Sequence, residues 1–100
     1  MQSHYEADFT REQGSTEADW LRWLPGAVRD QALRLPAAGQ AEVAIGEGQL
    51  RLDWFALPPR QIALARFPRL MVHFRFVDVT EAQRHAFMKY FDLYMQRGGG

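Results

Sequence analysis

The sequence predicts an α+β fold, with an antiparallel β-meander of about four to five strands and two helices. The helices are a short N-terminal one and a long C-terminal one, and the C-terminal helix is expected to pack on one face of the sheet. Residues 40–77 alternate between apolar and other side chains between turn residues, which is typical of neighbouring antiparallel strands. Residues 80–98 instead repeat apolar side chains at helical spacing and end in glycine.

Length and composition limit the classes of protein. The 100 residues suit one domain, expected over residues 1–97, with a flexible glycine tail at 98–100. The absence of cysteine excludes disulfides and thiolate chemistry. A net charge of zero argues against a nucleic-acid partner, and no apolar stretch is long enough to span a membrane. Without a secretory signal we expect a soluble, cytoplasmic protein, and abundant arginine and alanine indicate a bacterial origin.

The N-terminal third is expected to form a strand and then a short helix. Residues 4–9 alternate loosely, as a strand would. A helix then begins near Thr16, which can cap it, and acidic residues occupy its first turn. Pro25 and Gly26 are predicted to end this helix, and residues 27–34 to add a second, poorer helical turn.

Three turns divide the strand-like region and set its register. They are predicted at residues 47–48, 57–59 and 67–69. All three place the same residues on one apolar face, and this agreement predicts a meander. The two cross-strand rows of that face are Val43, Leu52, Leu64 and Val72, and Ala41, Trp54, Ile62 and Phe74.

The C-terminal helix has clear signals at both ends. Thr80 and Gln83 form a capping box, and Gly98 stops the helix. One half of the helix surface is rich in aromatic side chains and fits the apolar face of the sheet. Packing against the sheet therefore explains the composition of the helix, and no cofactor is expected. That half comprises Ala86, Phe87, Tyr90, Phe91, Tyr94 and Met95, and the polar strip comprises His85, Lys89, Asp92 and Gln96.

The opposite face of the predicted sheet mixes apolar and charged residues. A solvated face should be more polar, and a core should not hold several charges. Apolar residues among arginines are typical of protein interfaces. Three explanations stay open: the N-terminal segment covers this face, a homodimer or protein partner binds it, or a ligand binds there. The candidate interface residues are Arg51, Phe55, Met71, His73 and Arg75.

Charged pairs elsewhere give weaker indications of chemistry. Glu42 and Asp53 are predicted as cross-strand neighbours, which suits a salt-bridge cluster or, alternatively, paired acid–base carboxylates. Glu81 and His85 are one helical turn apart, but Glu81 also suits a helix N-terminus, so no metal site is expected. The sequence contains no nucleophile–base pair or nucleotide-binding motif, so we expect no catalytic residues, and an enzyme is the least favoured class.

A second candidate site lies between the sheet and the C-terminal helix. Arg66 is predicted on the apolar face of the sheet, where it either snorkels from the sheet end or points into a pocket. Such a pocket would bind a small apolar or anionic molecule. The candidate ligand-binding residues are Trp54, Arg66, Phe74, Tyr90 and Tyr94.

The element order resembles that of the START-related helix-grip (polyketide-cyclase-like) domains. The stretch "ADWLRWLPGAV", residues 18–28, is similar to the first helix and following Pro-Gly of some members. The resemblance implies binding of an apolar molecule between sheet and helix and carries over no catalytic residue. The family usually has more strands than this chain has room for, which argues against a large cavity.

Taken alone, the sequence favours a non-catalytic interaction module that self-associates through the mixed face. The alternative is a small-molecule binder with its pocket between the sheet and the C-terminal helix.

Overall fold

The computed structural model describes residues 4–98, so the glycine tail predicted at 98–100 lies outside the described residues except for Gly98. The α+β class is confirmed: five antiparallel strands form one sheet in the order β1-β5-β4-β3-β2, with two helices. The elements are β1 (Asp8–Gln13), α1 (Glu17–Ala27), β2 (Leu33–Arg34), β3 (Gln40–Ile45), β4 (Gly48–Ile62), β5 (Ala65–Val77) and α2 (Glu81–Gln96).

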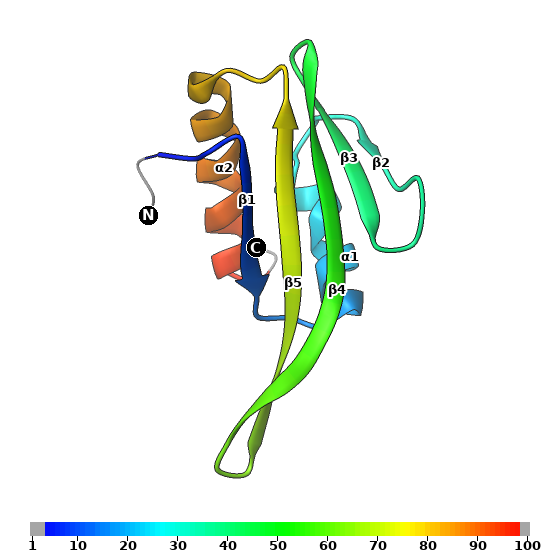
Figure 1. Ribbon diagram of the computed structural model, residues 1–100, viewed down its shortest axis with the longest axis vertical. Coiled ribbons are helices and arrows are strands. Elements are labelled where there is room, and N and C mark those ends of the chain that lie inside the picture. The colour runs from blue at the N-terminus through cyan, green and yellow to red at the C-terminus, as the bar shows by residue number, and fades with distance from the viewer. Residues whose placement is uncertain (1–3, 99–100) are drawn as a thin grey trace.

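Both helices pack on the same face of the sheet, behind it in the view of Figure 1. Trp20 of α1 contacts Trp54 of β4 and Phe91 of α2, with ring centroids 5.6 and 6.0 Å apart. Phe91 in turn meets Phe74 of β5 edge-on at 5.8 Å. The core is therefore a single layer of large side chains between the sheet and the two helices.

Helix α1 is longer than predicted because it continues through Pro25 and Gly26 to Ala27. Thr16 caps its first turn as predicted, and its Oγ1 accepts a hydrogen bond from the backbone N–H of Asp19 at 3.1 Å. Pro25 has no backbone N–H, so the helix continues through it with one backbone hydrogen bond fewer. A Cβ at Gly26 would lie 2.0 Å from the hydroxyl of Tyr94, so this glycine permits the close approach of α2.

The segments before and after α1 also differ from prediction. The first described strand is Asp8–Gln13 rather than residues 4–9, because its pairing with β5 sets its bounds. The poorer helical turn predicted at 27–34 is wrong. Arg29 takes a positive φ of 58°, which ends the helical conformation, and Leu33–Arg34 then pair with β3.

The β3–β4 hairpin turns at Gly46-Glu47, one position earlier than predicted. Gly46 has a φ of 57°, a conformation that favours glycine at the first position of a tight turn. The register therefore shifts by two residues, and Val43 pairs with Leu50. Because side chains alternate with a period of two, this shift changes the cross-strand partners and leaves every residue on its predicted face.

The predicted turns at 57–59 and 67–69 are wrong, because β4 and β5 form one long hairpin that turns at Ala63-Leu64. The prolines of residues 58–59 are accommodated by a bulge between Leu57 and Arg60, where the ladder needs fewer backbone donors. Trp54 pairs with Val72 in the core instead of with Ile62. The predicted rows are therefore wrong in their cross-strand partners, although the residues near the helices do share the predicted buried face. Ile62 and Leu64 do not belong to that face, because both are exposed at the end of the hairpin.

Helix α2 has the predicted ends, since Thr80 and Gln83 form a capping box and Gly98 follows the helix with a φ of 64°. Its buried face is rotated from the predicted one. Met88 is buried instead of the exposed Ala86, and the predicted polar residue Asp92 is buried as well. Asp92 is buried because its carboxylate accepts hydrogen bonds from side chains that include Arg11 of β1, as described below.

Candidate interaction surface

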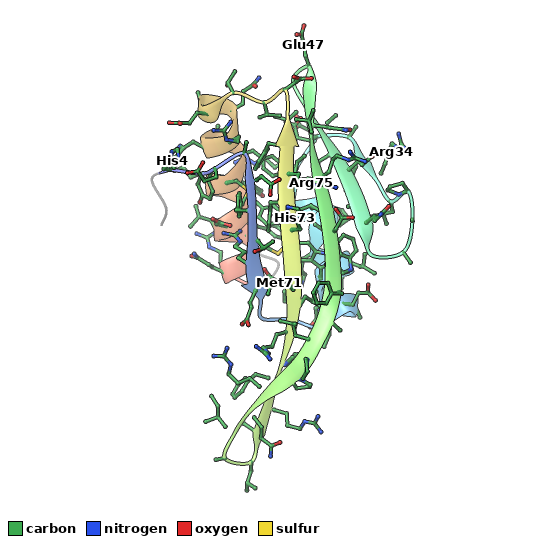
Figure 2. All side chains as sticks on the ribbon, in the orientation of Figure 1. His4, Arg34, Glu47, Met71, His73 and Arg75 are labelled. Atoms are coloured by element: carbon green, nitrogen blue, oxygen red, sulfur yellow. The ribbon has the colours of Figure 1, made fainter. Side chains whose placement is uncertain are left out.

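Neither helix of the described chain covers the second face of the sheet, which we call the open face. Figure 2 shows Met71, His73 and Arg75 following one another along β5. All five predicted interface residues lie on the open face: Arg51 pairs with Arg75, Phe55 with Met71, and His73 with Asp53. Phe55 is 61% exposed. The structure thus brings these five residues together on two neighbouring strands.

The alternative prediction, that the N-terminal segment covers this face, is wrong. Trp20 is completely buried on the helix side of the sheet, and Trp23 packs against the same core. Strand β1 joins the edge of the sheet beside β5. It therefore widens the open face instead of covering it.

Polar pairs cross the open face between neighbouring strands. Nε2 of His73 lies 2.6 Å from Oδ1 of Asp8, a hydrogen-bonding distance, and Arg75 forms an ion pair with Asp53, with 3.4 Å between Nη2 and Oδ2. Exposed pairs of this kind contribute only about 0–1 kcal/mol each to stability. Their main effect here is to hold charged side chains of both signs in a fixed pattern on an uncovered surface.

The predicted juxtaposition of Glu42 and Asp53 is wrong, because the two-residue register shift separates them. Glu42 stands opposite Arg51, with 3.9 Å between Oε2 and Nε, and also pairs with Arg34 at 3.5 Å. Asp53 stands opposite Gln40. Glu42 pairs with two arginines and Asp53 with a third, Arg75, so the arrangement is a set of salt bridges and not an acid–base dyad.

The open face contains a hollow of about 430 Å³ beside the loop that precedes β3. Apolar and polar groups both line it, and one wall carries Met71 and His73. The lining residues are Thr10, Ala38, Gly39, Gln40, Asp53, Trp54, Phe55, Met71 and His73. Since Phe55 and Met71 are both candidate interface residues, the hollow lies within the predicted interaction surface.

The outer half of the β4–β5 hairpin, residues 57–69, extends beyond both helices at the lower end of Figure 1, and we call it the arm. Every residue from 58 to 68 is exposed. Leu64 at the tip is 98% exposed, Ile62 59% and Phe67 49%. Large apolar side chains of this exposure, gathered on one element, mark an interaction site in a folded protein.

The apolar residues of the arm continue those of the open face. Cross-strand pairs run outward from Phe55–Met71 to Leu57–Arg69, then Arg60–Phe67, then Ile62–Ala65. Residues two apart on regular β5 share a face, and the single bulge in β4 keeps its partners on that face. These four rows form one stripe, which we call the apolar stripe.

The arm is cationic as well as apolar. It carries three arginines, and the sequence has no acidic residue between Asp53 and Asp78. Glu12 of β1 pairs with Arg69 at 2.7 Å and with Arg60 at 3.4 Å, which ties the base of the arm to the body. Arg66, near the tip, pairs with none of the described acidic residues.

The predicted ligand-binding residues are not brought together. Arg66 lies on the exposed arm, so its placement on the apolar face beside the core was wrong; the long hairpin carries it away from the helices. Trp54 and Phe74 are buried in the packed core, with 7% and 1% exposure. Tyr90 and Tyr94 lie at the margin between the helices. The Arg29 guanidinium stands 3.6 Å from the Tyr90 ring centre.

Sequence reasoning missed a buried polar cluster that joins β1 to α2. The Tyr5 hydroxyl donates to Oδ2 of Asp92 at 2.5 Å, and the Arg11 guanidinium donates to both carboxylate oxygens of Asp92. Burial and this hydrogen bond raise the pKa of Tyr5 to about 12. The one signal in the sequence was an aspartate beside the apolar face of the C-terminal helix. Its partners could not be identified from the sequence because they lie more than 80 residues away along the chain.

The remaining polar residues form no further site. Glu81 reaches His4, 3.4 Å from Nδ1, while the His85 ring packs edge-on against Tyr5. Among residues 4–98 no three histidine, aspartate or glutamate side chains are grouped as a metal site would need. Neither helix in that range has the length and apolar character to cross a membrane.

Comparisons of the chain with protein-family models, curated proteins and solved structures found no match. The resemblance to helix-grip domains therefore stays a prediction. The candidate surface rests on the geometry described above.

Proposed function

We propose that the protein is a non-catalytic interaction module that binds a second copy of itself through the open face and the apolar stripe. The observation that carries the proposal is the continuous run of exposed apolar side chains from Phe55 to the arm, on a face flanked by ion pairs. An apolar centre with a polar rim is the usual composition of a protein interface.

The charge pattern of the open face favours a second copy over an unrelated partner. In a two-fold symmetric dimer the same patch must complement itself. A patch of one sign would repel its copy, whereas the open face carries acids and bases side by side, as in the pairs Glu42–Arg51 and Asp53–Arg75. Two such faces can meet with opposite charges in register.

The alternative, a small-molecule binder with its pocket between sheet and α2, has less support. Phe74 and Phe91 fill that space, each at most 1% exposed, and their rings are in contact. A hollow of about 320 Å³ does lie beside Tyr90 at the edge of the helices. It lacks the other four predicted ligand residues.

Sedimentation of the wild-type chain and of two matched variants tests the proposal. Phe55→Arg puts an unpaired charge at the centre of the interface, and we expect it to weaken association at least tenfold. Leu35→Arg changes a side chain of similar exposure, 56% against 61%, in the loop before β3. We expect this control to associate like wild type.

Both variants should keep the wild-type melting temperature when monomeric, because neither side chain belongs to the core. A wild-type chain that sediments as a monomer at high concentration would overturn the proposal. So would equal effects of Phe55→Arg and Leu35→Arg on association.

A further inference from the structure

We propose that the two copies exchange arms: the arm of each lies along the open face of the other, with Leu64 in the partner's hollow. This inference rests on the proposed self-association and adds to it the part of each copy that makes the contact.

The shape of the chain provides the first argument. The arm has no helix on either side, so its apolar side chains can be covered only by something outside its own body. The hollow opens on the same face as the apolar stripe, since Phe55 and Met71 belong to both. A partner placed face to face with this chain therefore meets the arm and the hollow together.

The spacing of the stripe provides the second argument. Its rows are about 7 Å apart, because alternate residues of a strand share a face. A two-fold axis between the second and third rows places Ile62–Ala65 of one copy over Phe55–Met71 of the other. Leu64, just beyond Ile62, then reaches the neighbouring row Asp53–His73, which lines the hollow. The same symmetry operation fills both hollows at once.

Charge provides the third argument. All twelve acidic residues and nine of the twelve lysines and arginines lie outside residues 57–69, so the arm carries three positive charges and the rest of the chain three negative ones in excess. Opposite net charges draw the arm of one copy toward the body of another.

An anionic lipid surface would also attract an apolar, cationic hairpin. A bilayer, however, would leave the hollow and the ion pairs of the open face without a role. The second copy accounts for the arm, the hollow and the charge asymmetry together, and lipid binding is an outcome of the test below.

Thiol cross-linking tests the arrangement directly, because the chain contains no cysteine of its own. Copies carrying Leu64→Cys are mixed with copies carrying Thr10→Cys, an exposed position that lines the hollow. We expect mild oxidation to link the two variants into a mixed dimer. Ala82→Cys, exposed on α2 at the helix side, is the matched control and should not link to Leu64→Cys.

A shortened chain tests the energetic role of the arm. Replacing residues 58–68 by Asn-Gly joins Leu57 to Arg69 through a two-residue turn that suits a hairpin. All the removed side chains are exposed, so the monomer should melt within a few degrees of wild type. We expect its self-association to weaken by at least tenfold.

The outcomes separate this inference from the proposed function. A wild-type dimer that shows no Leu64–Thr10 link, or that survives removal of the arm, overturns arm exchange and leaves the open-face dimer in place. A wild-type monomer overturns both. A monomer that pellets with phosphatidylglycerol vesicles, and loses this on removal of the arm, overturns arm exchange and assigns the arm to lipid.

Discussion

Strands β4 and β5 pass through two different environments, and their inner and outer halves have similar apolar residues. In the body, the alternate residues Leu52, Trp54 and Phe74 are at most 7% exposed. In the arm, Leu64 and Phe67 are 98% and 49% exposed. The comparison teaches that an apolar strand is buried only as far as another element reaches over it, whatever its own composition.

Element lengths explain where the change occurs. The 16 residues of α2 span about 24 Å at the rise of an α-helix, and the 15 residues of β4 span about 50 Å at the rise of a strand. A helix of this length covers about half of such a strand. The uncovered half becomes the arm, and its apolar side chains stay exposed.

The largest expected effect is in the body. Phe91→Ala should lower the free energy of unfolding by about 3–5 kcal/mol, because a completely buried aromatic side chain leaves a cavity against Trp20 and Phe74. Urea titration measures the loss. Phe67→Ala removes the same side chain from the arm and, in the monomer, should cost under about 0.5 kcal/mol. Similar losses for the two variants would remove the distinction between body and arm.

An intermediate effect is expected at the cluster that fastens β1 to α2. Tyr5→Phe removes a hydrogen bond to the buried carboxylate of Asp92 and should cost about 1.5–3 kcal/mol near neutral pH. Thermal or urea unfolding checks this value. An unchanged stability would mean that Arg11 alone satisfies Asp92.

The same tyrosine predicts a pH dependence. Burial and the bond to Asp92 raise the pKa of Tyr5 from 10.0 to about 12, so the folded chain holds this proton more tightly than the unfolded chain. The stabilisation is fully present below pH 10 and is lost as the pH rises toward 12. Spectrophotometric titration should show one late-titrating tyrosine, absent from Tyr5→Phe; a tyrosine that titrates normally would contradict the cluster.

The smallest expected effect is at the tip of the arm. Leu64→Ala should change the free energy of unfolding of the monomer by less than about 0.5 kcal/mol, because the side chain is 98% exposed. The measurement needs protein dilute enough to remain monomeric. A loss of several kcal/mol under those conditions would mean that the arm folds back on its own body.

Local signals predicted much of the fold. The capping box of Thr80 and Gln83, the cap at Thr16 and the glycine at 98 each act within a few residues, so the sequence alone locates the start of both helices and the end of α2. Alternation on β3, β4 and β5 likewise predicted the faces of Val43, Leu52 and their neighbours. It also placed the five candidate interface residues on one face.

Other features depended on contacts between distant segments. Prolines favour turns, so the pair at residues 58–59 and Pro68 each predicted a turn. In the structure β4 and β5 pair on both sides of these prolines, which therefore lie within one long hairpin. Asp92 looked like a surface residue until Tyr5 and Arg11, far away in the sequence, came beside it. Gly26 looked like a helix stop until Tyr94 came to lie against it.

The sequence by itself determined the class of fold, the start of both helices, the end of α2 and which residues of the inner strand segments share a face, because capping, alternation and helical spacing act over a few residues. Only the tertiary structure decided which apolar residues are buried, which strands pair and that a cationic arm extends from the body. Those outcomes depend on how far the helices reach across the sheet, a quantity that no local stretch of sequence contains.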